Sequence, residues 1–297
     1  PSPSSRTCWR LNNTPRLRFA LANPLAGGNT SGLAKPVPRC STKVPRQEPL
    51  VLTMHALTTK PGLALFDLDH TLIPIDSDYA WGEFTSTLGW TDPVEFGRRN
   101  DEFFAHYRAG TLDINEYVRF ATDAVRAKGP TEAAAAHARF MREVVQPVMT
   151  EAARALLQQH RDAGDEIVIV TATNEFVTRP IAAAFGVDEL IAVQLEQAPG
   201  ADGAPWITGN ILGVPSAREG KVTRMNQWLA QRGWGWDDVH TTFYSDSLND
   251  LALLEKVNQP VATNPDPRLR ALAQERGWRI LDLFSAPSAE PASQTAS

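Results

Sequence analysis

Short apolar segments alternate with longer amphipathic segments over residues 62–283. Apolar runs of strand length occur at Leu63–Phe66, Glu166–Val170, Leu190–Val193, His240–Tyr244, Val261–Thr263 and Arg279–Leu283. Helical spacing of apolar residues separates most of these runs, at Glu175–Phe185, Gly220–Gln231, Asn249–Val257 and Pro267–Arg276. Strands that alternate with helices predict a parallel sheet with helices on both faces. We therefore expect an α/β fold with a doubly wound parallel sheet.

The long segment after the first apolar run departs from this alternation. Residues 79–160 have a helical pattern, and Gly89, Gly110 and Gly129-Pro130 divide them into about four helices. A helical block of this length is too long for a simple crossover between two strands. We therefore expect an inserted helical cap domain at 79–148, on a Rossmann-like core formed by 61–78 and 149–284. The turn-forming residues Pro199–Gly203 also predict a hairpin within Gln194–Ile211.

Both ends of the chain lack a pattern that could build a core. Residues 1–53 are rich in Ser, Thr, Pro, Asn and Arg, and they hold eight basic residues against one acid, Glu48. We expect a disordered basic leader, which is either a targeting segment or translated sequence upstream of Met54, the first methionine. Residues 285–297 are expected to form a disordered tail.

Charge and cysteine content exclude several classes of protein. The net charge is -5, and beyond residue 53 acidic residues outnumber basic ones. An acidic body lacks the basic surface that binds nucleic acid, so we expect no nucleic-acid partner. No run of about 18 apolar residues occurs, so we expect no membrane span. Both cysteines, Cys8 and Cys40, precede the body, which excludes thiol catalysis and disulfides there and is compatible with a cytoplasmic location.

Polar residues directly follow three of the predicted strands. They are Asp67 and Asp69 after the first strand, Thr171 after the second, and Asp246, Asn249 and Asp250 after the fourth. In parallel α/β sheets, ligands bind beyond the carboxyl ends of the strands. We therefore expect these carboxylates, the hydroxyl and the amide to converge on one edge of the sheet.

A cluster of carboxylates repels itself and needs a cation. Carboxylate oxygens suit Mg²⁺, which keeps several waters and is usually held by one or two carboxylates together with a substrate phosphate. A carboxylate can also attack phosphorus and form an aspartyl phosphate. Asp67 and Asp69 stand two residues apart on an extended segment, so one can attack while the other donates a proton to the leaving oxygen. These residues predict a Mg²⁺-dependent reaction at a phosphate ester.

Four segments together resemble the motifs of the haloacid dehalogenase superfamily. The run from Leu63 to Thr71, which includes Asp67 and Asp69, is similar to the first motif. The second, third and fourth motifs are resembled, in the same order and with similar wide spacing, by Thr171, Lys221 and the pair Asp246 and Asp250. The resemblance covers about residues 62–283. The helical insertion after the first motif looks like the cap of the phosphoserine-phosphatase-like branch, which implies a phosphoric monoester hydrolase.

The resemblance implies a role for each of these residues. Asp67 would be the nucleophile and a metal ligand, and Asp69 would be the general acid and base, with its backbone carbonyl on the metal. The other roles would be phosphate binding by Thr171 and Asn249, charge stabilisation by Lys221, Mg²⁺ binding by Asp246, and support of the site by Asp250. The partner would be a small phosphorylated metabolite, and no oligomeric state is predicted.

Two departures from the phosphoserine phosphatases concern the leaving group. Those enzymes usually have Ser-Gly-Gly at the second motif, where this chain has Thr171-Ala172-Thr173, and a glutamate in the early cap, where it has Asp76. Asp76 and Asp78 either select a substrate amine or are solvated residues at a helix start. Phosphoserine is the first expected substrate, and an amino-alcohol phosphate such as histidinol phosphate is the alternative. A phosphotransferase and an inactive binding protein on the same fold are the remaining alternatives.

Overall fold

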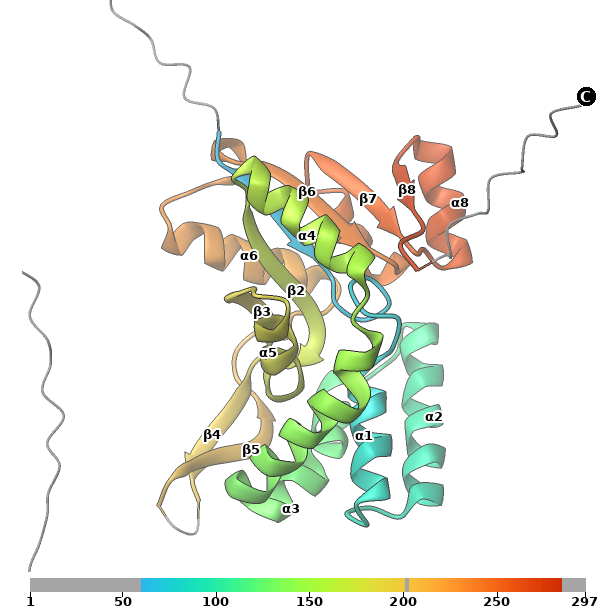
Figure 1. Cartoon of the computed structure of the whole chain (residues 1–297), viewed down its shortest axis with the longest axis vertical. Helices are drawn as coiled ribbons and strands as arrows, with labels where there is room; N and C mark the ends of the chain where they lie inside the picture. The colour runs from blue at the N-terminus through green and yellow to red at the C-terminus, as the bar shows by residue number, and fades with distance from the viewer. Residues whose placement is uncertain (1–59, 201–202, 285–297) are drawn as a thin grey trace, which may run out of the picture. The chain divides into compact units, whose positions relative to one another are not determined.

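The computed structural model describes residues 60–200 and 203–284 (Figure 1). The expected basic leader and the expected tail lie outside these described residues. None of the helices in the described part is long and apolar enough to cross a membrane.

A six-stranded parallel sheet forms the centre of the fold, with the strand order β3-β2-β1-β6-β7-β8. Its strands are β1 (Gly62–Phe66), β2 (Glu166–Asn174), β3 (Glu189–Val193), β6 (His240–Ser245), β7 (Gln259–Thr263) and β8 (Arg279–Leu281). The apolar strand β1 lies between β2 and β6, where both of its faces are covered. At its start, Gly62 allows a close approach, since a Cβ atom there would lie 1.8 Å from Oδ1 of Asp165. The predicted doubly wound parallel sheet is confirmed.

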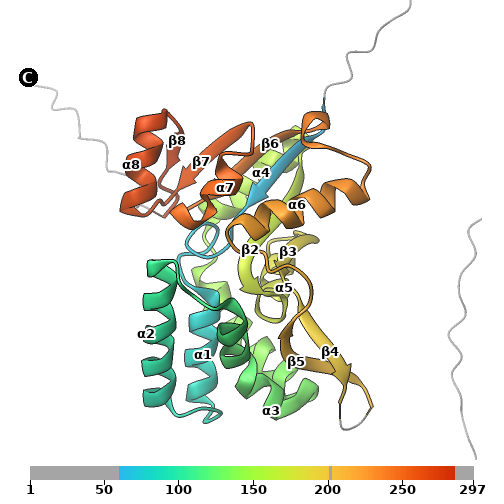
Figure 2. The same ribbon diagram turned by 180° about the vertical axis from the view of Figure 1, so that it is seen from behind.

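Alternate residues of β1 enter two different hydrophobic cores. Ala64 and Phe66 pack on the face that α4 (Glu151–Ala163) and α5 (Glu175–Ala184) cover. Leu63 and Leu65 pack on the other face, together with apolar residues of the helices α6 (Glu219–Gln231), α7 (Leu251–Leu254) and α8 (Pro267–Arg276). Figure 1 shows α4 in front of the sheet, and Figure 2 shows α6 in front of it from behind. The period of two along a strand therefore supplies side chains to both layers.

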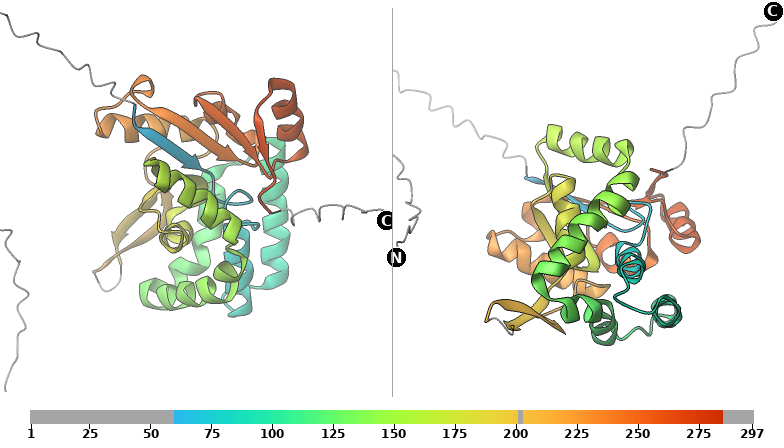
Figure 3. Two further views of the ribbon diagram at one scale, coloured as in Figure 1. Left: turned by 45° about the horizontal axis from the view of Figure 1, so that its top comes forward. Right: turned by 60° about the horizontal axis from the view of Figure 1, so that its bottom comes forward.

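Three helices form the insertion between β1 and α4. They are α1 (Ser77–Thr87), α2 (Pro93–Ala109) and α3 (Ile114–Phe140), and each begins after an aspartate cap, at Asp76, Asp92 and Asp113 respectively. Short segments of π-helix (Met141–Val145) and 3₁₀-helix (Gln146–Val148) then lead into α4. The predicted break at Gly129-Pro130 is a kink inside α3, where Gly129 has a φ of 79°. Figure 3 shows α1, α2 and α3 grouped beside one another in two further orientations.

The predicted hairpin packs on this helical insertion. Its strands are β4 (Leu195–Pro199) and β5 (Pro205–Ile211), which pair antiparallel. Nε1 of Trp206 donates to the carbonyl of Arg126 on α3 at 3.4 Å, and Nε of Arg119 donates to Oδ1 of Asn210 at 3.3 Å. The hairpin thus contributes to the insertion although it follows β3 in the sequence. The first helix of the insertion, α1, begins at Ser77, two residues before the predicted start of the cap. The cap boundaries at 79 and 148 stay a prediction.

Two predicted elements differ from the structure. The predicted helix Asn249–Val257 is a 3₁₀ turn (Leu248–Asp250) followed by the short α7, and the chain returns to the sheet at β7. Just before β7, Oδ1 of Asn258 accepts from the backbone N–H and the hydroxyl of Thr241 at 2.8 and 3.0 Å. Strand β2 also continues beyond Val170 to Asn174, which pairs with Val193 after a register shift. The polar residues from Thr171 onward therefore lie at the end of the strand itself.

Candidate active site

The carboxyl ends of β1, β2 and β6 bring most of the predicted polar residues together. Asp67 is the first residue after β1, and its backbone N–H donates to the carbonyl of Tyr244 on β6 at 2.9 Å. Thr171 lies near the end of β2, and Asp246 follows β6 directly. The parallel register of the three strands therefore places groups that are up to 179 residues apart at one edge of the sheet.

Lys221 forms a buried bridge between two carboxylates. Its Nζ donates to Oδ1 of Asp67 at 2.8 Å and to Oδ2 of Asp250 at 2.7 Å. The hydroxyl of Ser245 donates to the same oxygen of Asp250 at 2.8 Å. Burial alone would lower the pKa of Lys221, but the carboxylates of Asp250 and Asp67 outweigh it and raise the pKa. The lysine is therefore a fixed positive charge beside Asp67.

The start of α6 aims this lysine. Gly220 precedes Lys221 and packs against the carbonyl of Pro215, which a Cβ atom on residue 220 would approach to 2.0 Å. Only glycine allows this contact, because it lacks that atom. The first turn of α6 thus lies close to the preceding loop, and the Lys221 side chain extends from it into the sheet edge.

Asp69 is held in a different direction from Asp67. Its Oδ2 accepts from the hydroxyl of Thr173 at 2.8 Å, and its Oδ1 accepts from the backbone N–H of Ser77 at 3.0 Å. Burial, and then the charge of Asp76, raise the pKa of Asp69 well above its ordinary value. The raised pKa favours the protonated form of this carboxyl, which is the form that a general acid requires.

Asp246 lies in a strongly acidic environment. Burial, followed by the charges of Asp67 and Asp250, raises the pKa of Asp246 to about 9. The hydroxyl of Thr71 is its hydrogen-bond donor, at 3.5 Å. Such an arrangement of buried carboxylates favours a cation, which would remove the repulsion between Asp67 and Asp246.

The donor set fits Mg²⁺ better than a metal held only by side chains. In the described part of the chain, no group of three or more His, Cys, Asp or Glu residues could hold a metal ion. Mg²⁺ does not require such a group, because it is commonly held by one or two carboxylates with water and phosphate. Asp67 and Asp246 supply two carboxylates. The side chain of Asp69 is engaged by Ser77 and Thr173, which leaves its backbone carbonyl as the third candidate ligand.

Thr171 and Asn249 stand on opposite sides of Asp67 in the sheet order. Oγ1 of Thr171 accepts from the N–H of Thr173 at 3.1 Å, and its carbonyl accepts from Ser216 at 2.6 Å. The residue that caps α5 is Asn174, whose Oδ1 accepts from the N–H of Val177 at 3.2 Å. The Asn249 backbone is fixed by the hydroxyl of Ser247 at 3.2 Å. The Thr171 hydroxyl and the Asn249 amide each keep donor capacity for another oxygen.

Asp76 and Asp78 have different environments although they are two residues apart. Oδ1 of Asp76 accepts from the N–H groups of Asp78 and Tyr79, at 3.1 and 2.9 Å, and so caps α1. Asp78 is only 6% exposed, and its Oδ1 accepts from Nδ2 of Asn174 at 3.1 Å. Burial, and then the charge of Asp76, raise the pKa of Asp78 to about 7. A solvated helix start therefore describes neither residue fully, and for Asp78 it is wrong.

Two tyrosines from the insertion reach this region, and neither was predicted from the sequence. Burial, and then the charge of Asp250, raise the pKa of Tyr107 on α2, and burial, and then the charge of Asp78, raise the pKa of Tyr117 on α3. Their helical spacing indicates a packed face of each helix, but not that the face meets the ends of the strands. The contacts of Thr173 and Ser77 with Asp69 were also not predicted.

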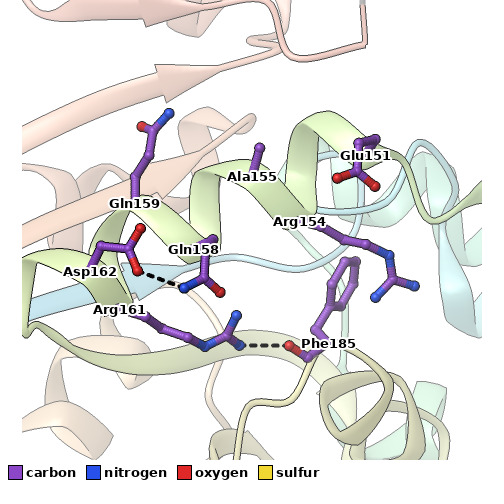
Figure 4. Close-up of a pocket in the computed structure, with 8 residues that line it drawn as sticks. All are labelled: Glu151, Arg154, Ala155, Gln158, Gln159, Arg161, Asp162 and Phe185. Carbon is purple, nitrogen blue, oxygen red and sulfur yellow. Dashed lines mark hydrogen bonds between the residues drawn. The ribbon is translucent and has the colours of Figure 1, made fainter.

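One surface hollow of the described chain lies apart from these residues. It is lined by residues of α4 and by Phe185, and includes Arg154, Arg161 and Asp162 (Figure 4). Arg161 donates to the carbonyl of Phe185 at 2.7 Å, and Gln158 donates to Asp162 at 2.7 Å. These polar groups already satisfy one another, and the hollow contains none of the predicted site residues.

The parallel sheet, with carboxylates, a lysine and a threonine at the carboxyl ends of its strands, defines a hydrolase with a Rossmann-like core. Residues 64–255 match the family of haloacid dehalogenase-like hydrolases, and the chain belongs to that family. A histidinol-phosphatase of Neisseria meningitidis is 43% identical over 222 residues, which cover 74% of this chain and 98% of that protein. A phosphoserine phosphatase of Mycobacterium tuberculosis is 28% identical over 90% of this chain and 82% of its own length.

Solved structures agree with this assignment. A protein of unknown function from Bordetella pertussis is 50% identical, with a TM-score of 0.70, over 76% of this chain and all of that chain. A phosphoserine phosphatase solved as a phospho-aspartyl intermediate analogue has a TM-score of 0.53 at 17% identity, over 75% of this chain and 93% of its own, which shows a common fold. The predicted family and the predicted enzyme class, a phosphoric monoester hydrolase, are confirmed by these relatives.

Proposed function

We propose that the protein is a Mg²⁺-dependent phosphatase that hydrolyses a small phosphorylated metabolite through an aspartyl phosphate on Asp67. The observation that carries this proposal is the bridge of Lys221 between Asp67 and Asp250, at 2.8 and 2.7 Å. The bridge fixes the Asp67 carboxylate at the sheet edge and keeps a positive charge where the negative charge of a phosphoryl group would develop. The carboxylate of Asp250 accepts the second hydrogen bond of Lys221 and so holds the ammonium group beside Asp67.

The first step forms a bond between an Asp67 oxygen and phosphorus, while the bond from phosphorus to the ester oxygen breaks. Asp69 gives its proton to that leaving oxygen, which departs as an alcohol. In the second step Asp69 takes a proton from water, whose oxygen attacks phosphorus and releases Asp67 and inorganic phosphate. The raised pKa of Asp69 supports the acid role, because burial and the charge of Asp76 favour the protonated carboxyl that donates in the first step.

Phosphate oxygens would be bound by Thr171, Asn249 and Lys221. Mg²⁺ would be held by the carboxylates of Asp67 and Asp246 and the backbone carbonyl of Asp69, and would neutralise charge on the phosphoryl oxygens. Intact residues at all of these positions argue against an inactive binding protein. The cytoplasmic location expected from the sequence stays a prediction.

For the substrate, we favour an amino-alcohol phosphate, with histidinol phosphate first and phosphoserine second. The relative named histidinol-phosphatase is 43% identical along almost its whole length, while the named phosphoserine phosphatase is 28% identical. Asp78 supports a substrate with a cationic group, because the hydrogen-bond donor to this buried carboxylate, Nδ2 of Asn174, is neutral. No Lys, Arg or His of the described chain pairs with it. Asp76 is already engaged as a helix cap and would act by its charge.

A panel of phosphorylated metabolites, with released phosphate as the readout, tests the proposal. Histidinol phosphate, phosphoserine, glycerol phosphate and p-nitrophenyl phosphate would be compared at equal Mg²⁺. We expect the highest kcat/KM for histidinol phosphate and no turnover by Asp67→Asn. Transfer of the phosphoryl group to an added alcohol in preference to water would identify a phosphotransferase instead. The absence of turnover with every ester would overturn the proposal.

A further inference from the structure

Thr173 joins the end of β2 to the side chain of the proposed general acid. Its hydroxyl donates to Oδ2 of Asp69 at 2.8 Å, although the two residues are 104 positions apart in the chain. The backbone N–H of Thr173 donates in turn to Oγ1 of Thr171, the predicted phosphate ligand, at 3.1 Å. Only 8% of Thr173 is exposed. One buried residue therefore contacts both the acid and a phosphate-binding hydroxyl.

The strand that carries Thr173 is fixed on both sides of it. Val170 before it and Asn174 after it both pair with residues of the neighbouring strand β3. The side chain of Asn174 also caps α5, by accepting from the N–H of Val177 at 3.2 Å. The hydroxyl of Thr173 thus extends from the sheet and not from a free loop. Groups on rigid elements are held more precisely than groups on loops.

Two donors from different elements fix the plane of the Asp69 carboxyl group. Oδ1 accepts from the backbone N–H of Ser77, at the start of α1, at 3.0 Å, while Oδ2 accepts from Thr173. Each carboxyl oxygen has two acceptor directions, so one direction on each oxygen stays available for a proton or for another donor. A backbone N–H only donates, whereas a hydroxyl donates or accepts. The contact with Thr173 can therefore persist whether or not Oδ2 carries a proton.

We propose that Thr173 is a positioning residue, which holds Asp69 in the orientation from which Oδ2 exchanges a proton with the leaving oxygen. This inference rests on the proposed function, in which Asp69 acts first as an acid and then as a base. The proton leaves Oδ2 for the ester oxygen as the bond from that oxygen to phosphorus breaks. A proton from water then replaces it, as the water oxygen bonds to phosphorus and releases Asp67. A glycine in place of Thr173, as in the Ser-Gly-Gly of the phosphoserine phosphatases, has no hydroxyl to make this contact.

The rate of phosphoenzyme formation with two leaving groups tests the inference. Thr173→Val keeps the shape of the side chain and removes the hydroxyl, whereas Thr173→Ser keeps the hydroxyl. With an alkyl phosphate, we expect Thr173→Val to slow this step by about 10- to 100-fold, a part of the roughly 10²–10⁴-fold that acid assistance supplies. With p-nitrophenyl phosphate, whose leaving group needs no proton, the loss should stay below about 3-fold. Thr173→Ser should keep most of the wild-type rate on the alkyl ester.

A variant that also lacks the acid separates positioning from packing. Thr173→Val in the background of Asp69→Asn should cause no further loss on the alkyl ester, because Thr173 acts through Asp69. Thr208→Val is the matched control, since the Thr208 hydroxyl also donates to a carboxylate, Oε2 of Glu196, at 2.7 Å on the hairpin. It should leave the rate on both esters unchanged. Losses that add in the double variant, or equal losses on both esters by Thr173→Val, would overturn the inference.

Crystal structures of the variants give a second readout, which needs no turnover. We expect the Asp69 carboxyl to leave its position beside the Ser77 N–H in Thr173→Val and to keep it in Thr173→Ser. An unmoved Asp69 carboxyl in Thr173→Val would overturn the inference. Absence of phosphoenzyme in wild type, with the Asp69 carboxyl displaced in Thr173→Val, would confirm the positioning contact and count against the proposed function.

Discussion

Nζ of Lys221 lies 2.8 Å from Oδ1 of Asp67, although the two residues are 154 positions apart in the chain. The contact joins the first turn of α6 to the end of β1. Both side chains are largely buried, with 2% of the lysine side chain and 11% of the aspartate side chain exposed. The small exposed part of Asp67 is what a reacting group needs, because it must be held by the protein and still meet a substrate.

Replacing Lys221 with methionine should lower both stability and activity. The change keeps most of the side-chain volume but leaves Asp67 and Asp250 without their shared cation. Breaking a buried ion pair from one side typically costs about 3–5 kcal/mol. We expect a loss of this order in urea unfolding, together with loss of phosphatase activity. Lys128→Met is the control, because Lys128 pairs with Glu132 at the surface and should change stability by about 1 kcal/mol or less. Equal effects of the two changes would contradict the role of Lys221.

Asp67→Asn should abolish turnover, since an amide cannot form the acyl phosphate. Lys221 keeps its bond to Asp250, so the variant should still fold. Rapid quenching after addition of a substrate with a radiolabelled phosphoryl group would measure the covalent intermediate. We expect label on the wild-type protein and none on the variant. Turnover by the variant near the wild-type rate would show that another group is the nucleophile.

Asp69→Asn should produce a defect that depends on the leaving group. General acid–base assistance is typically worth about 10²–10⁴-fold, and a good leaving group needs no proton. The rate of phosphoenzyme formation should therefore fall strongly with an alkyl phosphate and weakly with p-nitrophenyl phosphate. The amide oxygen of asparagine can still accept from the N–H of Ser77, and its N–H can donate to the hydroxyl oxygen of Thr173, so the local structure is kept. An equal loss on both esters, with phosphoenzyme formation rate-limiting and metal binding unchanged, would refute the acid role.

Mg²⁺ should support activity and Ca²⁺ should replace it poorly. Mg²⁺ requires a near-octahedral site with short bonds, whereas Ca²⁺ takes more ligands at longer distances. The larger ion would allow both oxygens of Asp67 to coordinate, and would thereby hold the nucleophile away from phosphorus. Phosphate release would be measured after chelation and after addition of each ion. Similar rates with both ions, or full activity in chelator, would exclude this account.

The sheet and its polar edge could be predicted because they follow from local patterns. Each strand is a short apolar run, and the groups at the strand ends stand next to those runs in the sequence. Asp67 and Asp246 are examples, since each follows its strand directly. The parallel arrangement then determines that these neighbours meet, whatever the length of the chain between them.

Contacts made by helices of the insertion could not be predicted in this way. A helical period identifies the packed face of α2, but the group that Tyr107 meets depends on how α2 lies against the core. The hydrogen-bond partners of Asp250 could not be predicted either, because the position of Asp250 at the start of α7 suggests a helix cap. The structure shows instead that its carboxylate binds Lys221 and Ser245. Tertiary packing, and not local propensity, decides such contacts.

Asp78→Asn should stabilise the protein at neutral and higher pH while weakening the preference for cationic substrates. The pKa of Asp78 is about 7 in the folded chain against an ordinary value of 3.8, so between about pH 4 and 7 the folded state holds a proton that the unfolded state has released. Stability from this group is therefore fully present below about pH 4 and is lost as the pH rises through 7. Asparagine does not titrate and can still accept from Asn174, so the free energy of unfolding of the variant should exceed that of wild type by up to a few kcal/mol. This difference should develop between about pH 4 and 7 and persist at higher pH. Urea unfolding at several pH values would measure the gain, with the exposed Asp123→Asn as a control that shows no such trend.

The same variant should also lose part of its substrate preference, so that kcat/KM falls more for histidinol phosphate than for p-nitrophenyl phosphate. Parallel stability curves for variant and wild type would refute the raised pKa, and equal losses on both substrates would refute the contact with a cation.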